Sequence, residues 1–127
     1  TNYRLTLIAR IGMEDGSSSK HEKYVENTIE LEENQWKAIH KGMRRVATGY
    51  GAFNVLWETP VAGKTGTAQT GQFSGGTELK NYWFAGFVPA EQPRYTIVVL
   101  QDTQAEPAFS SAAIFARVAA GLEILAP

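Results

Sequence analysis

Hydrophobic and polar residues alternate at the start of the chain, which predicts a strand with one buried face. The apolar positions of this alternation are Tyr3, Leu5, Leu7, Ala9 and Ile11. Asp15-Gly16, followed by three serines, is typical of a turn. We expect the segment 20–30 to return as a second, exposed strand, so that residues 1–30 form a hairpin-like segment.

A helical period follows over residues 33–47. Its apolar residues recur at spacings of three and four and share one face: Trp36, Ile39, Met43 and Val46. Its cations are expected to form a solvated face or the end of the helix: Lys37, Lys41, Arg44 and Arg45. Gly49 and Gly51 then predict that the helix ends and a loop begins.

The pattern after Pro60 is typical of strands over 61–69, 82–88 and 95–100. The polar segment 71–80, which contains Gly75-Gly76, predicts an exposed loop. Short connections without intervening helices predict an antiparallel meander of at least three strands within the segment 61–100.

A second helix is predicted over 110–125, where Ser110 and Ser111 are suitable caps. Its apolar side carries Ile114, Phe115, Val118, Leu122 and Leu125. An antiparallel sheet covered by helices gives an α+β fold class.

Composition narrows the functional classes. The 127 residues carry 12 Lys plus Arg, 13 Asp plus Glu and no cysteine, so neither nucleic-acid binding nor cysteine-ligated metal is indicated. His21 and His40 lie far apart among charged residues and are expected to be solvated rather than metal ligands. No apolar run reaches the ~20 residues that cross a bilayer. The chain starts at Thr1 without a signal peptide, which suggests an excised or processed segment.

Gly63-Lys64-Thr65 matches the end of a phosphate-binding P-loop, but that interpretation fails. The pattern needs a glycine where Glu58 stands, and no helical period follows Thr65 to supply a helix dipole for phosphate.

As a strand with a regular pleat, the same segment places Lys64, Gly66 and Ala68 on one face. Thr65, Thr67 and Gln69 then lie on the other face. Gly66 allows a ligand to approach the backbone, Lys64 offers a fixed positive charge, and Thr67 offers a hydroxyl and a backbone N–H. These groups suit a substrate with a carboxylate and a carbonyl that becomes an oxyanion.

Lys64-Thr65-Gly66 is followed by Thr67-Ala68-Gln69, a polar segment, and Trp83-Phe84-Ala85-Gly86-Phe87-Val88-Pro89. With Gly42–Val46 before it and the terminal helix after it, this order resembles the C-terminal part of the transpeptidase domain of class B-like penicillin-binding proteins. Lys-Thr-Gly is one of three motifs of serine penicillin-recognising enzymes. The resemblance implies the C-terminal portion of one such domain over 1–127, with the penicillin-binding protein/β-lactamase-like fold.

The resemblance also implies roles for the residues of this strand. Lys64 and Thr67 would be catalytic, with Lys64 supplying positive potential and the Thr67 N–H forming half of the oxyanion hole. Thr65, Gly66, Thr67 and Gln69 would bind substrate, with the Thr67 hydroxyl on its carboxylate and Gln69 at the edge of the cleft. The resemblance implies no cofactor and no metal.

The other two motifs of the family are missing from these 127 residues. Ser17-Ser18-Ser19-Lys20 spells Ser-x-x-Lys, but glycine and charged residues flank it, so we expect a solvated turn rather than a nucleophile in an apolar helix. No serine is followed by Asn two positions later, so Ser-x-Asn is absent. The nucleophile is therefore expected in a preceding part of the domain, in the same or a separate chain.

The implied activity of the complete protein is D,D-transpeptidation, in which a serine is acylated by a D-Ala-D-Ala stem peptide of peptidoglycan. β-Lactam antibiotics would acylate the same serine. The implied location is extracytoplasmic, with a membrane-anchored parent that acts in cell shape or cell division. This chain alone should be inactive.

Two alternatives remain open at this stage. The first is a class D-like β-lactamase or penicillin-sensing receptor domain, which shares similar Lys-Thr-Gly and Trp-Phe-x-Gly strands. The second is a non-catalytic binding module on the same sheet. One motif of three in 127 residues is typical of a fragment rather than of a self-sufficient domain, with apolar faces left for a missing segment.

Overall fold

The computed structural model describes residues 1–5, 8–56 and 59–125, and of these it gives the backbone alone at Val55, Thr103, Gln104 and 123–125. The predictions for Leu7, Glu58 and the Leu125 side chain lie outside this part. The chain divides into two compact units, Thr1–Glu33 and Asn34–Pro127, which are described separately.

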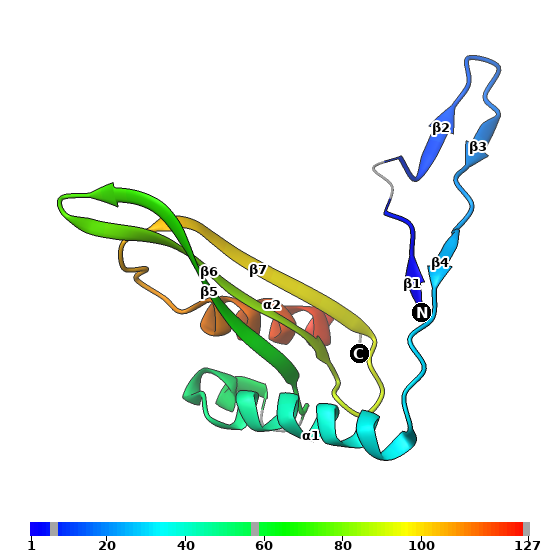
Figure 1. The fold of residues 1–127 in the computed structure, drawn as a ribbon. Helices are drawn as coiled ribbons and strands as arrows, with labels where there is room; N and C mark the ends of the chain where they lie inside the picture. The colour runs from blue at the N-terminus through cyan, green and yellow to red at the C-terminus, as the bar shows by residue number, and fades with distance from the viewer. Residues whose placement is uncertain (6–7, 57–58, 126–127) are drawn as a thin grey trace. The chain divides into compact units, whose positions relative to one another are not determined.

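The first unit is a ribbon of short strands: β1 (Asn2–Tyr3), β2 (Arg10–Gly12), β3 (Ser18–Lys20) and β4 (Val25–Asn27). β1 pairs with β4 and β2 with β3, both antiparallel (Figure 1). The prediction of one long strand with a buried face is wrong, because two short strands form and both Tyr3 and Ile11 are about half exposed. A two-stranded ribbon has no second layer of its own to cover an apolar face.

The remaining elements are α1 (Glu33–Thr48), η1 (Gly51–Leu56), β5 (Ala62–Ser74), β6 (Thr77–Val88), β7 (Tyr95–Gln104) and α2 (Ser111–Leu125). The strands form one antiparallel sheet in the order β5-β6-β7, and α2 runs along one face of it (Figure 1). The predicted α+β class, with a three-stranded antiparallel sheet and two helices, is confirmed.

Three aromatic rings join the sheet to the helices. Phe84 of β6 packs edge-on against Phe115 of α2 with ring centroids 4.9 Å apart, and Phe53 of η1 contacts both rings. Small side chains on the same face of α2 are buried beside them: Ala112, Ala116 and Ala119. These residues form the core of the larger unit and bring α2 close to the sheet.

Two glycines allow this close packing. A Cβ at Gly86 would lie 2.5 Å from the Ala62 carbonyl oxygen and 3.2 Å from the Phe115 ring. A Cβ at Gly63 would lie 2.5 Å from the ring of Phe84. Glycine at these paired positions therefore lets β5, β6 and α2 meet without a steric clash.

Two predictions about loops are wrong. The expected loop after Gly49 contains η1, whose Phe53 and Leu56 are buried at helical spacing. The expected loop over 71–80 is mostly strand, because β5 and β6 continue to a two-residue turn at Gly75-Gly76. Both of these glycines have positive φ, which matches the twist of a hairpin and which other residues adopt at a cost.

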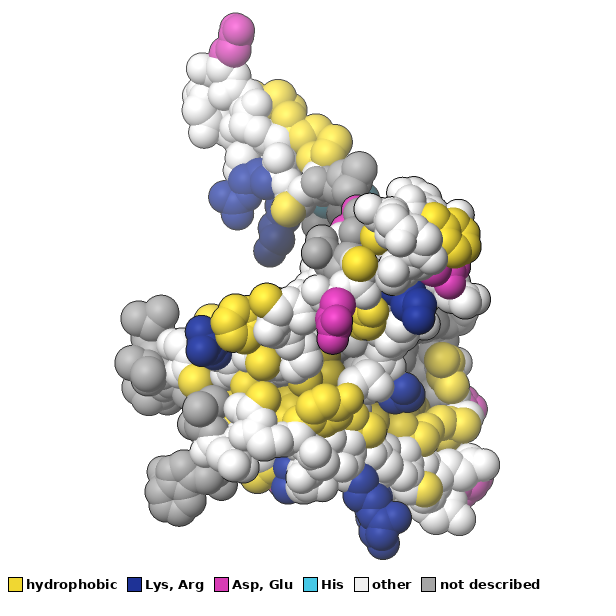
Figure 2. Space-filling model, turned by 90° about the vertical axis from the view of Figure 1, so that its left-hand side faces the viewer, with side chains coloured by type: hydrophobic (Ala, Val, Ile, Leu, Met, Phe, Trp, Pro, Cys, Tyr) yellow, Lys and Arg dark blue, Asp and Glu magenta, His cyan; other side chains and the backbone are white. Residues whose placement is uncertain are grey.

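Apolar side chains stay exposed on the sheet face opposite α2. Val98 is 59% exposed, Leu100 is 44% exposed and Trp83 is 38% exposed. On α1, Trp36 and Ile39 of the predicted apolar face are also exposed, whereas Met43 and Val46 are half-buried. Figure 2 shows hydrophobic side chains at the molecular surface in one view. Within the described residues, no helix has the length and apolar character needed to cross a membrane.

Candidate active site

The segment 64–69 lies in β5, where pairing with β6 is uninterrupted from Ala62 to Gln69. Because side chains alternate between the faces of a strand, Thr65 and Thr67 share the α2 side of the sheet with Phe84. Lys64 and Gly66 lie on the opposite face, where Gly66 is paired with Trp83. The strand therefore presents its hydroxyls and its amine in different directions.

β5 is an edge strand of the described sheet. In an antiparallel pair, about every second residue of an edge strand directs its backbone N–H and C=O away from its partner. These groups form a row of donors and acceptors beside the threonine side chains. Such an edge is suited to hydrogen-bonding an extended peptide or the carbonyl of a bound substrate.

Thr65, Gly66 and Thr67 together line a cavity of about 450 Å³. The cavity is completed by residues from four further segments of the chain: Tyr50, Tyr82, Trp83, Glu106, Pro107, Ser110, Ser111 and Ala112. Thr65 and Gly66 are half-buried and Thr67 is exposed, so the cavity opens to solvent along the strand. Its size suits a small polar ligand or a portion of a peptide.

Hydrogen bonds at Ser111 fix the wall of this cavity. The Ser111 side chain is buried, and its hydroxyl donates to the Tyr82 carbonyl at 3.0 Å. The Gln101 amide donates to the same hydroxyl oxygen at 2.8 Å. One serine therefore joins α2 to β6 and β7, and it holds the first turn of α2 against the wall. Ser110 caps the helix through its hydroxyl oxygen, which accepts the Ala113 N–H.

Lys64 is exposed and does not line the cavity. Its Nζ donates a hydrogen bond to the neighbouring Thr65 carbonyl at 2.7 Å. No ion pair of Lys64 occurs within the described part of the chain. The amine is therefore accessible from solvent and lies next to the backbone of the site strand.

Gln69 lies beyond the cavity, where the regular pairing of β5 ends. Its amide nitrogen donates to the Glu78 carboxylate of β6 at 2.9 Å. The sequence analysis did not predict a role for Glu78. It assigned residues 71–80 to a loop, in which Glu78 has no defined position relative to Gln69. A hairpin that turns at Gly75-Gly76 would have placed Gln69 and Glu78 on neighbouring strands, and the two glycines were the available signal.

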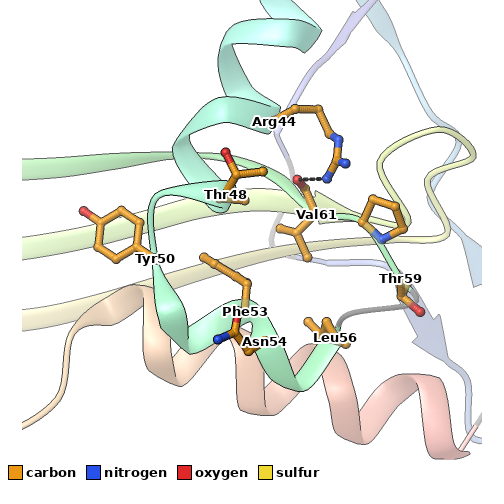
Figure 3. Close-up of a pocket in the computed structure, with 10 residues that line it drawn as sticks. Arg44, Thr48, Tyr50, Phe53, Asn54, Leu56, Thr59 and Val61 are labelled. Carbon is orange, nitrogen blue, oxygen red and sulfur yellow. Dashed lines mark hydrogen bonds between the residues drawn. The ribbon is translucent and has the colours of Figure 1, made fainter.

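A second cavity, of about 260 Å³, lies between the end of α1, η1 and the start of β5 (Figure 3). In it, Arg44 donates from Nη1 to the Val61 carbonyl at 3.0 Å, and its Nε lies 3.6 Å from the Glu91 carboxylate. The expectation that Arg44 is part of a solvated helix face is therefore wrong. Arg44 anchors the start of β5 three residues before Lys64.

Ser17 occupies a turn and Lys20 ends the exposed strand β3, so the literal Ser-x-x-Lys spelling is not on a helix. The Ser17 hydroxyl donates to the Asp15 carboxylate at 2.6 Å, and the Ser17 N–H donates to the same oxygen. These two hydrogen bonds lower the pKa of Asp15, the hydroxyl contributing most. Ser17 is thus hydrogen-bonded to an ionised carboxylate, and the lowered pKa makes that carboxylate a weaker base.

His40 contacts the ring of Phe87 at 5.6 Å between centroids, and Trp36 lies edge-on to it. Among the described residues, no three His, Cys, Asp or Glu side chains gather as metal ligands. The cavity brings hydroxyls and backbone groups of β5 together with the Glu106 side chain, whereas the Lys64 amine lies on the opposite face of the strand. Hydroxyl and backbone N–H donors of this kind suit a polarised carbonyl.

The family model of the penicillin binding protein transpeptidase domain matches residues 3–120. A crystal structure of a peptidoglycan synthetase from Bifidobacterium adolescentis has a TM-score of 0.71 to this chain at 20% sequence identity, which is a likeness of fold. The match covers 94% of this chain and 23% of that chain, so this chain spans under a quarter of the solved protein. A comparison with curated proteins gave no significant match. With a family match over nearly its whole length, this chain belongs to the penicillin binding protein transpeptidase domain family.

Proposed function

We propose that this chain supplies the Lys-Thr-Gly strand of a serine D,D-transpeptidase that cross-links peptidoglycan. The supporting observation is the cavity on β5, where Thr65, Gly66 and Thr67 meet beside an open strand edge. The reaction would be acylation of a serine by a D-Ala-D-Ala stem peptide, with release of the terminal D-Ala. An amine of a neighbouring stem peptide would then take the acyl group.

Thr67 is proposed to bind the substrate carboxylate through its hydroxyl and to offer its backbone N–H to the oxyanion. Thr65 and Gly66 would line the same site, Gly66 by leaving the backbone open to the ligand. Lys64 would supply positive potential from the opposite face of β5, where its amine is exposed. Gln69 would contact the substrate at the outer end of the strand.

The nucleophile and its base are proposed to come from a part of the domain outside these 127 residues. Two facts support this proposal: Ser-x-Asn is absent from the sequence, and Ser17 is bonded to Asp15 in an exposed ribbon. β-Lactams would acylate the same missing serine. Because peptidoglycan lies outside the cytoplasmic membrane, the proposed site is extracytoplasmic. The parent protein is proposed to be membrane-anchored and to serve cell shape or cell division.

The proposal is tested by Thr67→Val in the complete protein, which removes the hydroxyl and keeps the shape. Loss of a hydrogen bond to a charged group costs about 1.5–3 kcal/mol, so acylation by benzylpenicillin should slow by about 10- to 150-fold. Thr96→Val on exposed β7 is the matched control and should leave the rate unchanged. Equal acylation rates for the unmodified protein, Thr67→Val and Thr96→Val would contradict the role of Thr67.

Turnover distinguishes the related enzyme classes in the same assay. Slow deacylation is expected of a transpeptidase, whereas rapid hydrolysis of a chromogenic β-lactam would indicate a β-lactamase. A protein that is never acylated would be a binding module.

A further inference from the structure

Two successive backbone carbonyls immediately before β5 are held by groups from other parts of the chain. The Pro60 carbonyl accepts the Ala90 N–H at 2.7 Å. The Val61 carbonyl accepts a hydrogen bond from Nη1 of Arg44 at 3.0 Å (Figure 3). Regular pairing with β6 begins only at the next residue, Ala62. The start of the site strand is therefore fixed both from α1 and from the connection between β6 and β7.

An arginine side chain suits this position because its guanidinium carries five N–H donors in a fixed plane. While Nη1 donates to the Val61 carbonyl, Nε lies 3.6 Å from the carboxylate of Glu91, which follows Ala90 in the chain. Arg44 is half-buried and Val61 is buried, so solvent would replace this hydrogen bond poorly if the guanidinium were removed. One side chain thus links α1, the start of β5 and the β6–β7 connection.

A displacement at Val61 is passed along β5 to the site residues. Lys64 and Thr67 follow Val61 by three and six residues, on a strand whose pairing with β6 is regular over this length. Within the described residues β5 pairs with β6 alone, so no strand on its other edge holds it in place. Catalysis is sensitive to such displacements, since a misplacement of about 1 Å can cost on the order of 100-fold in rate.

We infer that Arg44 is a positioning residue, which holds the start of β5 so that Lys64 and Thr67 are correctly placed for acyl transfer. This inference rests on the proposed function and deepens it, because it assigns part of the site's geometry to a side chain of α1. Arg44 does not line the cavity beside Thr67 and acts only through β5. In acylation by a β-lactam, the serine oxygen bonds to the lactam carbonyl carbon, the ring C–N bond breaks, and the serine proton passes to the ring nitrogen.

The competing explanation is that Arg44 only stabilises the fold, and the rate constant of acylation at saturating benzylpenicillin separates the two. In the complete protein, Arg44→Met keeps the apolar stem of the side chain and removes its donors. This variant should be acylated about 10- to 100-fold more slowly. Arg44→Lys keeps one donor for the Val61 carbonyl and should lose only about two- to five-fold.

Arg45→Met and Arg45→Lys are the matched controls, because Arg45 is the exposed neighbour of Arg44 on the same helix. Both should be acylated at the rate of the unmodified protein. Ala119→Gly is the stability control, since Ala119 is buried on α2 and glycine weakens a helix. It should lower the melting temperature and leave the acylation rate unchanged at a temperature where every variant is folded.

Hydrogen exchange of backbone amides gives a readout that does not depend on acylation. Arg44→Met should speed exchange in β5, whereas Ala119→Gly should speed it in α2. An unchanged acylation rate or unchanged β5 exchange in Arg44→Met, or an acylation loss that Ala119→Gly reproduces, would overturn the positioning role. If Arg44→Met does not fold, Arg44→Lys decides, and a rate equal to that of Arg45→Lys overturns the role. If the unmodified protein is never acylated, the proposed function fails together with this inference.

Discussion

At the scale of single residues, hydrogen bonds determine the reactivity of Ser17 and the pKa of Asp15. The Ser17 hydroxyl donates to the Asp15 carboxylate at 2.6 Å, which stabilises the ionised acid and lowers its pKa. A serine nucleophile needs a base that can take its proton, and a carboxylate with a lowered pKa is a poor one. The geometry of this turn therefore supports a structural role for Ser17.

Ser17→Ala should raise the pKa of Asp15 toward its ordinary value, because the largest stabilising hydrogen bond is lost while the backbone N–H remains. A carboxyl with a lowered pKa stabilises the fold at pH above its unfolded pKa. That contribution disappears as the pH falls through the lower folded value. NMR titration of the Asp15 carboxyl in both proteins measures the shift, and an unchanged pKa would contradict this account.

The sequence predicted a strand over residues 64–69 but not the side chains that hold this strand and its neighbours in place. Arg44, Glu78 and Ser111 each act on a partner at least nine residues away in the chain. The local pattern of hydrophobic and polar residues cannot predict such contacts, since they depend on strand register and on helix placement. The resemblance to a family assigned roles to motif residues, and the folded chain was needed to find their neighbours.

At the scale of elements, the glycines at 63 and 86 control the distance between the sheet and α2. Gly86→Ala would place a Cβ against the Ala62 carbonyl oxygen, a backbone atom that cannot move away as a flexible side chain could. Overpacking of this kind costs about 1–3 kcal/mol, so the melting temperature of the complete protein should fall by several degrees.

Gly121→Ala on α2 is the matched control for this substitution. Its Cβ would meet nothing within 4 Å, so it should stabilise the helix by about 0.5–1 kcal/mol through reduced chain entropy. Calorimetry of both variants measures the contrast. A Gly86→Ala protein at least as stable as the unmodified one would show that β5, β6 and α2 are not closely packed.

Periodicity predicted the long elements well because their apolar faces repeat over several turns or strand positions. α1 and α2 match the expected 33–47 and 110–125 to within one residue at each end. The hydrophobic pattern did not predict the strands over 71–80, because this segment consists mostly of polar residues and glycine. The hairpin there is held by backbone pairing and by Glu78. The pattern also failed at η1, which is too short for a clear helical period.

In the described part of the larger unit, the core lies on the α2 side of the sheet and exposed apolar side chains lie on the other side. Trp83, Val98 and Leu100 lie exposed on the face opposite α2, and Trp36 and Ile39 add exposed apolar area on α1. Exposed apolar side chains that are gathered on one sheet face favour association with another segment. It is consistent with the proposal that a preceding part of the domain completes the fold.

The chain expressed alone should therefore be poorly soluble or molten. Dye binding to exposed apolar surface and a broad thermal transition are the expected observations. Calorimetry and near-ultraviolet circular dichroism test this directly. A monomer that melts sharply and cooperatively would show that the core around Phe84 and Phe115 is already sufficient.

We propose that these 127 residues supply the substrate strand of a serine acyl-transfer site and not its nucleophile. Labelling the complete protein with fluorescent penicillin, followed by mass spectrometry of the labelled peptide, tests it most directly. We expect one covalent label on a serine outside residues 1–127 and none on the isolated chain. Stoichiometric acylation of Ser17, or a complete protein that takes up no label, would contradict it.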